Sequence, residues 1–135
     1  MIRTATQSDL PWLQEHDRHI GAEELRASVL RGRILLAEQD GQTIGWMRWS
    51  LFWDEIPFMN MLYLLEGFRR QGLGRELVSR WEEDMCRQGH RRVMTSSQAN
   101  EEGQHFYRRL GYQDAGALLL PGEPLEIIFI KELAP

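Results

Sequence analysis

One short stretch of the chain, residues 69–75, combines arginines with glycines, whose backbone carries no side chain. Arg69, Arg70 and Arg75 surround two glycines, Gly72 and Gly74, directly before apolar residues at helical spacing. The first N–H groups of a helix have no partner within the helix, and the helix dipole is positive at that end. Glycines let a ligand oxygen approach the backbone closely. The stretch therefore favours binding of an anion, above all a phosphate.

Two common phosphate-binding loops do not fit this stretch. A Walker loop needs a lysine after its second glycine, whereas the only lysine of the chain is Lys131. A Rossmann fingerprint would need a third glycine at position 77, where the chain has Leu77. The pattern that remains is Arg-x-x-Gly-x-Gly, over residues 69–74.

A second motif lies further along, where Asn100 precedes the segment HFYRRLGY that contains Tyr107. The Arg-x-x-Gly-x-Gly pattern resembles the pyrophosphate-binding signature of the GNAT superfamily of N-acetyltransferases. Asn100 and Tyr107 stand at the spacing of that family's Asn-containing, Phe-Tyr-x-x-Leu-Gly helix. The stretch MLYLLEG matches the strand that precedes the signature. The expected strands and helices of residues 1–135 follow the same order as those of the family. The chain also resembles a bacterial subgroup of the superfamily.

The resemblance implies that an acetyl group moves from acetyl-CoA to a primary amine by direct attack. The backbone of residues 70–75 would hold the pyrophosphate, while Arg69 would pack or pair with Glu66. The acetyl-pantetheine arm would bond to the main chain before this loop, where an amide of Leu64 or Leu65 would donate to the oxyanion. The residues implied to hold coenzyme A are Leu62, Tyr63, Leu64, Arg70, Gln71, Gly72, Leu73, Gly74, Arg75, Asn100 and Tyr107.

Tyr107 is the residue that the resemblance implies as the general acid. A phenol within hydrogen-bond reach can protonate a leaving thiolate. The helical pattern alone also allows Tyr107 to be a core aromatic residue. Likewise, Asn100 could contact the pantetheine arm or cap the helix that follows it.

Acidic and aromatic residues before the central strand are candidates for the acceptor site. Asp54 and Glu55 could accept a proton or attract a cationic amine, while Glu66 and His105 are weaker candidates for the base. A solvated acidic turn is the alternative interpretation. Aromatic surface beside carboxylates suits a cation, so the residues expected to touch the acceptor are Trp53, Asp54, Glu55 and Phe58.

The elements that must position these residues follow from periodicity and turn signals. Strands are expected over 1–6, on both sides of Asp40-Gly41, and over 57–66, 91–97 and 124–133. Helices are expected over 8–16 and 21–33, from Leu73 to Gly89, and from Asn100 to Gly111. Alternation along one strand puts Trp46 and Arg48 on one face, opposite Met47 and Trp49. The resemblance implies a central, mostly antiparallel sheet of six or seven strands with splayed central strands and about four helices.

Bulk composition narrows the function classes. The chain has 135 residues, fitting one domain over 1–135, and a net charge of -4, which speaks against nucleic-acid or membrane partners. Its single cysteine, Cys86, is expected to be a buried or neutral thiol. We expect a cytoplasmic enzyme without a metal, acting on a small-molecule or peptide amine, with a homodimer left open. The alternatives are a non-catalytic acyl-CoA-binding module and a phosphate-binding regulator that prefers ATP.

Overall fold

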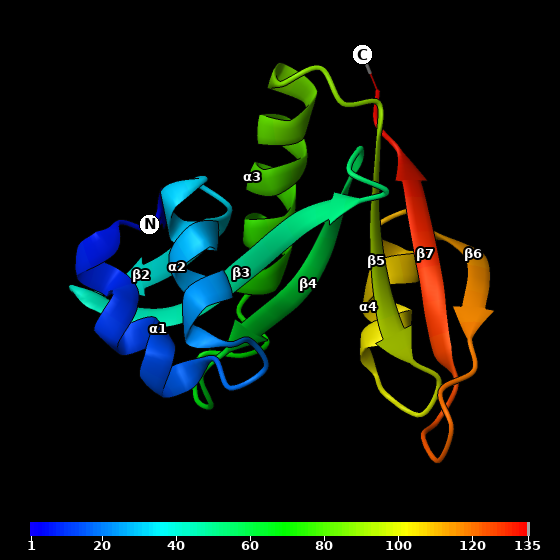
Figure 1. Ribbon diagram of the computed structural model, residues 1–135, viewed down its shortest axis with the longest axis horizontal. Helices are drawn as coiled ribbons and strands as arrows, with labels where there is room; N and C mark the ends of the chain where they lie inside the picture. The colour runs from blue at the N-terminus through cyan, green and yellow to red at the C-terminus, as the bar shows by residue number, and fades with distance from the viewer. Residues whose placement is uncertain (135) are drawn as a thin grey trace. The chain divides into compact units, whose positions relative to one another are not determined.

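Residues 1–134 are described by the structure, a computed structural model, and form an α/β fold (Figure 1). The strands are β1 (Ile2–Thr4), β2 (Ile34–Gln39), β3 (Gln42–Phe52), β4 (Ile56–Leu64), β5 (Arg92–Gln98), β6 (Gln113–Leu118) and β7 (Glu126–Glu132). The helices are α1 (Leu10–His16), α2 (Ala22–Leu30), α3 (Leu73–Arg87) and α4 (Gly103–Arg109), with a short 3-10 turn at Gln7–Asp9. None of the helices within these residues has the length and apolar character needed to cross a membrane.

The strands of the described chain lie in the order β1-β2-β3-β4-β5-β7-β6. β4 and β5 are parallel, whereas β1–β2, β2–β3, β5–β7 and β6–β7 are antiparallel. This confirms the predicted mixed, mostly antiparallel sheet with about four helices.

The chain divides into two compact units. The first contains Met1–Ser50 and Met61–Trp81, and the second contains Leu51–Asn60 and the chain from Glu82 onward. The predicted anion-binding loop lies in the first unit, and the predicted acid Tyr107 lies in the second. The prediction of one domain over 1–135 stays a prediction.

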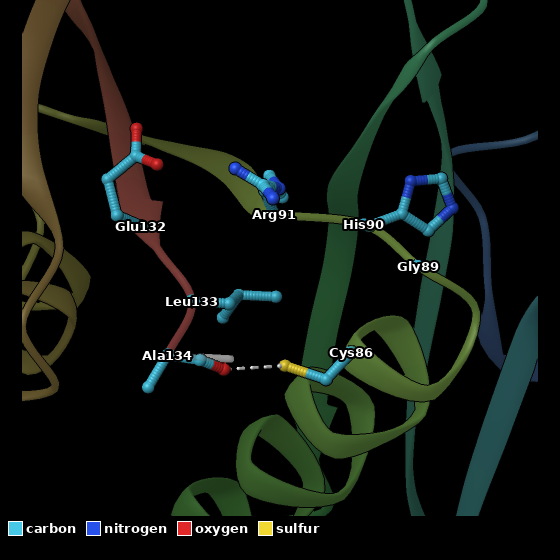
Figure 2. Close-up of a pocket in the computed structure, with 7 residues that line it drawn as sticks. All are labelled: Cys86, Gly89, His90, Arg91, Glu132, Leu133 and Ala134. Atoms are coloured by element: carbon cyan, nitrogen blue, oxygen red, sulfur yellow. Dashed lines mark hydrogen bonds between the residues drawn. The ribbon is translucent and has the colours of Figure 1, made fainter.

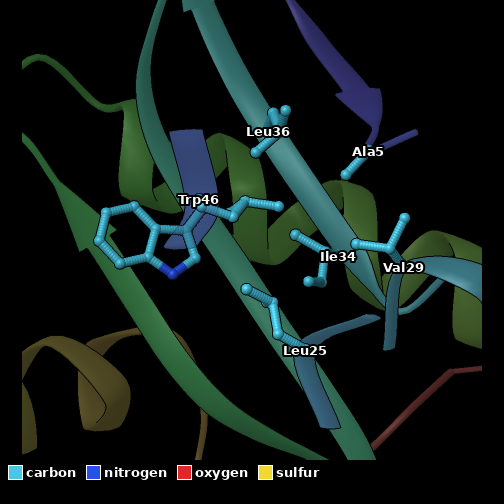
Figure 3. Close-up of a cluster of buried hydrophobic side chains, with 7 residues drawn as sticks. Ala5, Leu25, Val29, Ile34, Leu36 and Trp46 are labelled. Atoms are coloured by element: carbon cyan, nitrogen blue, oxygen red, sulfur yellow. The ribbon is translucent and has the colours of Figure 1, made fainter. Parts of the chain in front are cut away.

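In the first unit, α1 and α2 cover one face of β2 and β3 (Figure 3). The side chains of this core are Ala5, Leu13, Leu25, Val29, Ile34, Leu36 and Trp46. On β3, Trp46 and Arg48 contact Asp17, which follows α1, while Trp49 lies 6.4 Å from the ring of Trp81 on α3. The predicted alternation along this strand is confirmed, and both faces of the sheet are buried by helices.

Two tight hairpin turns join neighbouring strands. Asp40 and Gly41 both have positive φ, which confirms the predicted turn between β2 and β3. Trp53 and Asp54 also have positive φ, at 57° and 59°, in the turn between β3 and β4. Neither is a glycine, and a bulky residue in this region carries strain.

In the second unit, β5, β7 and β6 form an antiparallel group that packs with α4. Phe129 of β7 is fully buried and lies 6.0 Å from the ring of Tyr107 on α4. β6 was not predicted from the sequence. Its six residues are all exposed and Gly116 bends its backbone, so the strand shows no alternation of apolar and polar residues.

The helix ends agree with the glycine signals. After α3, the amide of His90 donates to the carbonyl O of Met85 and the amide of Gly89 to that of Cys86. This pair of hydrogen bonds, with Gly89 at positive φ, is a Schellman ending. Gly111, also at positive φ, follows the end of α4. Both predicted ends are confirmed.

Candidate functional site

The loop before α3 has the backbone of an anion site. Between the end of β4 at Leu64 and the start of α3 at Leu73, Arg70 and Gly72 have φ of 65° and 83°. The amide of Glu76 donates to the carbonyl O of Gly72, the first hydrogen bond of the helix. The backbone amides directly before Glu76 therefore have no acceptor within the helix. No atom lies within 4 Å of the place where a Cβ on Gly72 would stand. A ligand oxygen can therefore reach this backbone.

The side chains of the loop divide into two groups. Arg69 donates from Nε to the carbonyl O of Leu64 at 2.9 Å and lies over the ring of Tyr63 at 5.0 Å. It therefore packs on β4, the first of the two expected alternatives. Gln71 donates to the carbonyl O of Gly67, so both side chains hold the loop in shape.

Arg70 and Arg75 form the other group, because both are exposed and neither has a partner within residues 1–134. Two unpaired guanidinium groups beside a helix N-terminus suit a pyrophosphate. The residues present thus fit the diphosphate of coenzyme A.

β4 runs toward this loop beside a glycine of β3. A Cβ built on Gly45 would lie 2.5 Å from Leu64 Cδ2 and 2.7 Å from the carbonyl O of Tyr63. Only glycine therefore allows this close approach of β3 to β4. The amide of Leu65 donates to the carbonyl O of Ile44 at 2.8 Å, so it has an acceptor of its own.

A cavity of about 340 Å³ opens in the first unit, beside Tyr63. It lies between α1 with the segment after it on one side and β3 and the end of β4 on the other. Its lining residues are Glu15, His16, Arg18, His19, Trp46, Met61, Tyr63 and Leu65. Sequence reasoning missed this cavity, because its residues meet only in the folded sheet. The rings of Trp46 on β3 and Tyr63 on β4, with centroids 5.1 Å apart, form its aromatic wall.

A buried carboxylate lies behind the wall of this cavity. Asp17 is 2% exposed and accepts hydrogen bonds from Arg48 Nε at 2.8 Å, from Trp46 Nε1 at 3.1 Å and from the amide of His19 at 3.3 Å. Asp17 thereby fixes both the wall residue Trp46 and the segment after α1. The sequence pattern placed Arg48 correctly but gave no partner for it.

Tyr107 is a buried residue of the second unit. Its ring lies 5.3 Å from Phe106, 5.8 Å from Tyr112 and 6.0 Å from Phe129. Burial raises the pKa of Tyr107 to about 12, the hydroxyl of Thr95 lowers it, and the charge of Glu101 raises it again. Tyr107 therefore keeps its proton at neutral pH.

Asn100 lies in the turn before α4, in the same unit. The helix begins at Gly103 with Glu102 in the cap position, so the prediction that Asn100 caps it is wrong. Asn100 lies in a turn with Ala99, three residues before the helix begins. Asn100 is exposed, which leaves its amide open to solvent or to a ligand.

The residues predicted for the acceptor lie around the β3–β4 turn, in the second unit. Trp53 is 76% exposed, Asp54 and Glu55 are exposed, and Phe58 is half-buried. A cavity of about 560 Å³ contains two of the four, Trp53 and Glu55. Its other lining residues are Ile56, Pro57, Gly89, His90, Arg91, Arg92 and Glu132. Two arginines, Arg91 and Arg92, therefore line the same cavity as Glu55.

A smaller cavity of about 340 Å³ lies beside it, between the end of α3 and the last strand (Figure 2). Cys86 lines it and donates from Sγ to the carbonyl O of Ala134 at 3.4 Å. Cys86 is exposed, so of the two expected alternatives, a buried or a neutral thiol, the buried one is wrong. No cluster of metal-binding side chains occurs in residues 1–134.

Comparison with known proteins identifies the family. A family model described as an acetyltransferase (GNAT) domain matches residues 31–114. A comparison with curated proteins gives no match.

Solved structures share the fold at low identity. An acetyltransferase of the GNAT family from Bacillus cereus has a TM-score of 0.80 at 19% identity, over 100% of this chain and 98% of its own. Ribosomal-protein-alanine N-acetyltransferase from Brucella melitensis gives 0.80 at 21%, over 98% and 99%. PaiA N-acetyltransferase from Thermoplasma acidophilum, in complex with coenzyme A, gives 0.78 at 18%, over 98% of each chain. The family match spans more than half of the chain, including the loop before α3, and this protein therefore belongs to the GNAT acetyltransferases.

Proposed function

We propose that this protein transfers an acetyl group from acetyl-CoA to a primary amine, and that Tyr107 protonates the leaving thiolate. The observation that carries the proposal is the loop before α3. Its left-handed Arg70 and Gly72 turn the chain into the helix, and the free guanidinium groups of Arg70 and Arg75 stand beside it. Backbone amides and these two charges would hold the pyrophosphate.

Acetyl-CoA supplies a thioester carbonyl and a thiolate leaving group. The amine nitrogen bonds to the carbonyl carbon, the C–S bond breaks, and the proton of Tyr107 goes to sulfur. The proton lost by the amine restores the phenol through solvent. Since the amide of Leu65 is bonded to Ile44, we assign the oxyanion contact to the amide of Leu64.

For the acceptor we propose the cavity beside Tyr63. The main chain of Tyr63 belongs to the segment proposed for the pantetheine arm, while its side chain lines this cavity. An amine held against Trp46 and Tyr63, with Glu15 nearby, would meet aromatic faces and a carboxylate, which suits a cation. The residues Trp53, Asp54, Glu55 and Phe58 stay the competing prediction.

Ligand-dependent stability tests the cofactor. Acetyl-CoA at about 100 times its Kd stabilises a protein by about 2.7 kcal/mol, so it should raise the Tm while ATP and NAD should not. The variant with Arg70→Ala and Arg75→Ala should lose most of this shift. Arg26→Ala, an exposed helical arginine without a partner in the described chain, is the matched control. If ATP raised the Tm and acetyl-CoA did not, the result would favour the phosphate-binding regulator.

Turnover tests the chemistry. Thiol release from acetyl-CoA is followed with spermidine, a lysine peptide, a peptide with a free α-amine, an aminoglycoside and an amino acid. Tyr107→Phe should bind acetyl-CoA normally and lose about 100-fold or more in kcat. Tyr112→Phe removes another buried phenol, bonded to Glu82, and should keep kcat. Binding of acetyl-CoA without any turnover would favour the acyl-CoA-binding module.

A further inference from the structure

His16 is the last residue of α1 and lines the cavity beside Tyr63. Its ring nitrogen Nδ1 lies 2.8 Å from the carbonyl O of Trp12, one turn earlier in the helix. A carbonyl oxygen only accepts hydrogen bonds, so Nδ1 carries a proton and donates it. The neutral ring then has its free lone pair on Nε2, which is the nitrogen that can accept a proton.

The ring of His16 is also held on one face. It stacks on Trp12, with ring centroids 3.9 Å apart and an interplanar angle of 15°. Trp12 in turn meets Trp46 edge to face at 5.5 Å, and Trp46 lies 5.1 Å from Tyr63. The hydrogen bond and the stacking together fix the orientation of the imidazole, while Nε2 has no partner within residues 1–134.

The other charged or titratable side chains that line this cavity are less suited to accept a proton. They are Glu15, Arg18, His19 and Tyr63. Arg18 is a donor only. A carboxylate such as Glu15 attracts an ammonium ion but binds a proton weakly at neutral pH, since carboxyl groups ionise at about pH 4. The ring of His19 is exposed and has no partner in the described chain, so nothing fixes its tautomer.

We propose that His16 is the general base of the reaction, and that its Nε2 takes a proton from the cationic amine bound against Trp46 and Tyr63. Imidazole exchanges its proton between about pH 5 and pH 8, which suits this task near neutral pH. The inference rests on the proposed function, because it needs the acceptor amine in the cavity beside Tyr63.

The protons balance over one turnover. An ammonium ion has no lone pair, so one proton must leave before the nitrogen can bond to the thioester carbon. That proton goes to Nε2 of His16 and forms the imidazolium. The second proton, lost after the N–C bond has formed and the C–S bond has broken, restores the phenol as described above. The imidazolium then releases its proton to solvent, so each turnover yields one proton.

Thiol release with spermidine as the acceptor tests the base. His16→Phe keeps an aromatic ring to stack on Trp12 and removes both ring nitrogens. We expect it to lower kcat about 100-fold or more near pH 7, with KM for acetyl-CoA within about 3-fold of the parent value. Gln14→Ala, at an exposed position of the same helix, is the control and should keep kcat. Equal losses in the two variants would overturn the proposal.

The pH dependence separates a base from a structural residue. Between about pH 7 and about pH 9.5 the neutral fraction of a primary amine rises more than 100-fold, so the need for a base falls. The loss in His16→Phe should therefore shrink about 10-fold or more over this range. The charged groups nearby are the same in both proteins: those of the cavity, the pair of Asp17 and Arg48 behind it, and Arg69 over Tyr63. A loss that stays constant with pH would overturn the proposal.

Imidazole nitrogen NMR gives a readout without turnover. The spectrum of His16→Phe assigns the signals of His16, and the neutral ring should show a protonated Nδ1 and an unprotonated Nε2. The opposite tautomer would overturn the proposal.

The outcomes distinguish this inference from the proposed function. If His16→Phe keeps kcat while Glu15→Gln raises KM for spermidine, the cavity holds the amine and only the base is wrong. If the parent protein releases no thiol with any amine, the proposed function fails and this inference falls with it.

Discussion

Arg48 Nε lies 2.8 Å from Asp17 Oδ2, and both side chains are buried in the first unit. Asp17 Oδ2 also accepts a hydrogen bond from the indole N–H of Trp46, so one carboxylate joins β3 to the segment after α1. Removing one partner of a buried pair leaves an uncompensated charge, which costs about 3–5 kcal/mol. We expect Arg48→Ala to lower the free energy of unfolding by about this amount, measured by urea denaturation.

The exposed pair of Arg108 with Asp114 provides the control for this prediction. Their side chains are 37% and 54% exposed at a separation of 2.9 Å. Water already solvates both groups, so Asp114→Asn should leave the urea midpoint nearly unchanged. Equal losses in the two variants would mean that burial adds nothing to the pair of Asp17 and Arg48.

Local signals explain which parts of the fold could be predicted from the sequence. The start of α3 at Leu73, the glycine that stops it at position 89 and the turn at Asp40-Gly41 depend on residues within a few positions of each other. Such features follow from turn and capping chemistry. The loop at residues 69–75 belongs to the same class, because its glycines and arginines are contiguous.

Features that depend on distant residues could not be predicted. β6 is held by its pairing with β7, and its own residues are exposed and without alternation. The cavity beside Tyr63 needs α1, β3 and β4 together, and the partner of Arg48 lies 31 positions away at Asp17. These contacts form between residues that are distant in the sequence, and no local sequence pattern predicts them.

Gly45 tests how tightly β3 must approach the proposed cofactor segment. A Cβ there would meet the carbonyl O of Tyr63 at 2.7 Å, and this backbone atom can yield only if β4 moves. We expect Gly45→Ala to cost about 1–3 kcal/mol in the free energy of unfolding and to raise KM for acetyl-CoA. Gly21→Ser is the control, since Gly21 is the N-cap of α2, a position that serine also suits, its φ is −71° and no atom lies within 4 Å of the new Cβ. If Gly45→Ala kept the stability of the parent protein, β4 would be free to move away from β3 at no cost.

Acid sensitivity should depend on Asp9. The hydrogen bonds from Arg3 lower the pKa of Asp9 from 3.8 to about 2. A carboxylate with a lowered folded-state pKa contributes stability above its unfolded pKa and loses it as pH falls through the folded value. The parent protein should therefore lose stability between about pH 4 and pH 2 more steeply than Asp9→Asn. Urea midpoints across this range measure the difference, and parallel curves would show that the pair contributes nothing.

Acceptor kinetics decide between the two cavities. If the amine binds beside Tyr63, Glu15→Gln should raise KM for a cationic acceptor such as spermidine several-fold, because Glu15 lines the same cavity as the aromatic residues Trp46 and Tyr63. The variant with Asp54→Asn and Glu55→Gln would then keep its KM, since neither carboxylate lines the cavity beside Tyr63. The reverse pattern would assign the acceptor to the β3–β4 turn, where the strained backbone of Trp53 presents an exposed indole. KM for acetyl-CoA is the internal control, because neither set of substitutions lies in the loop of residues 70–75.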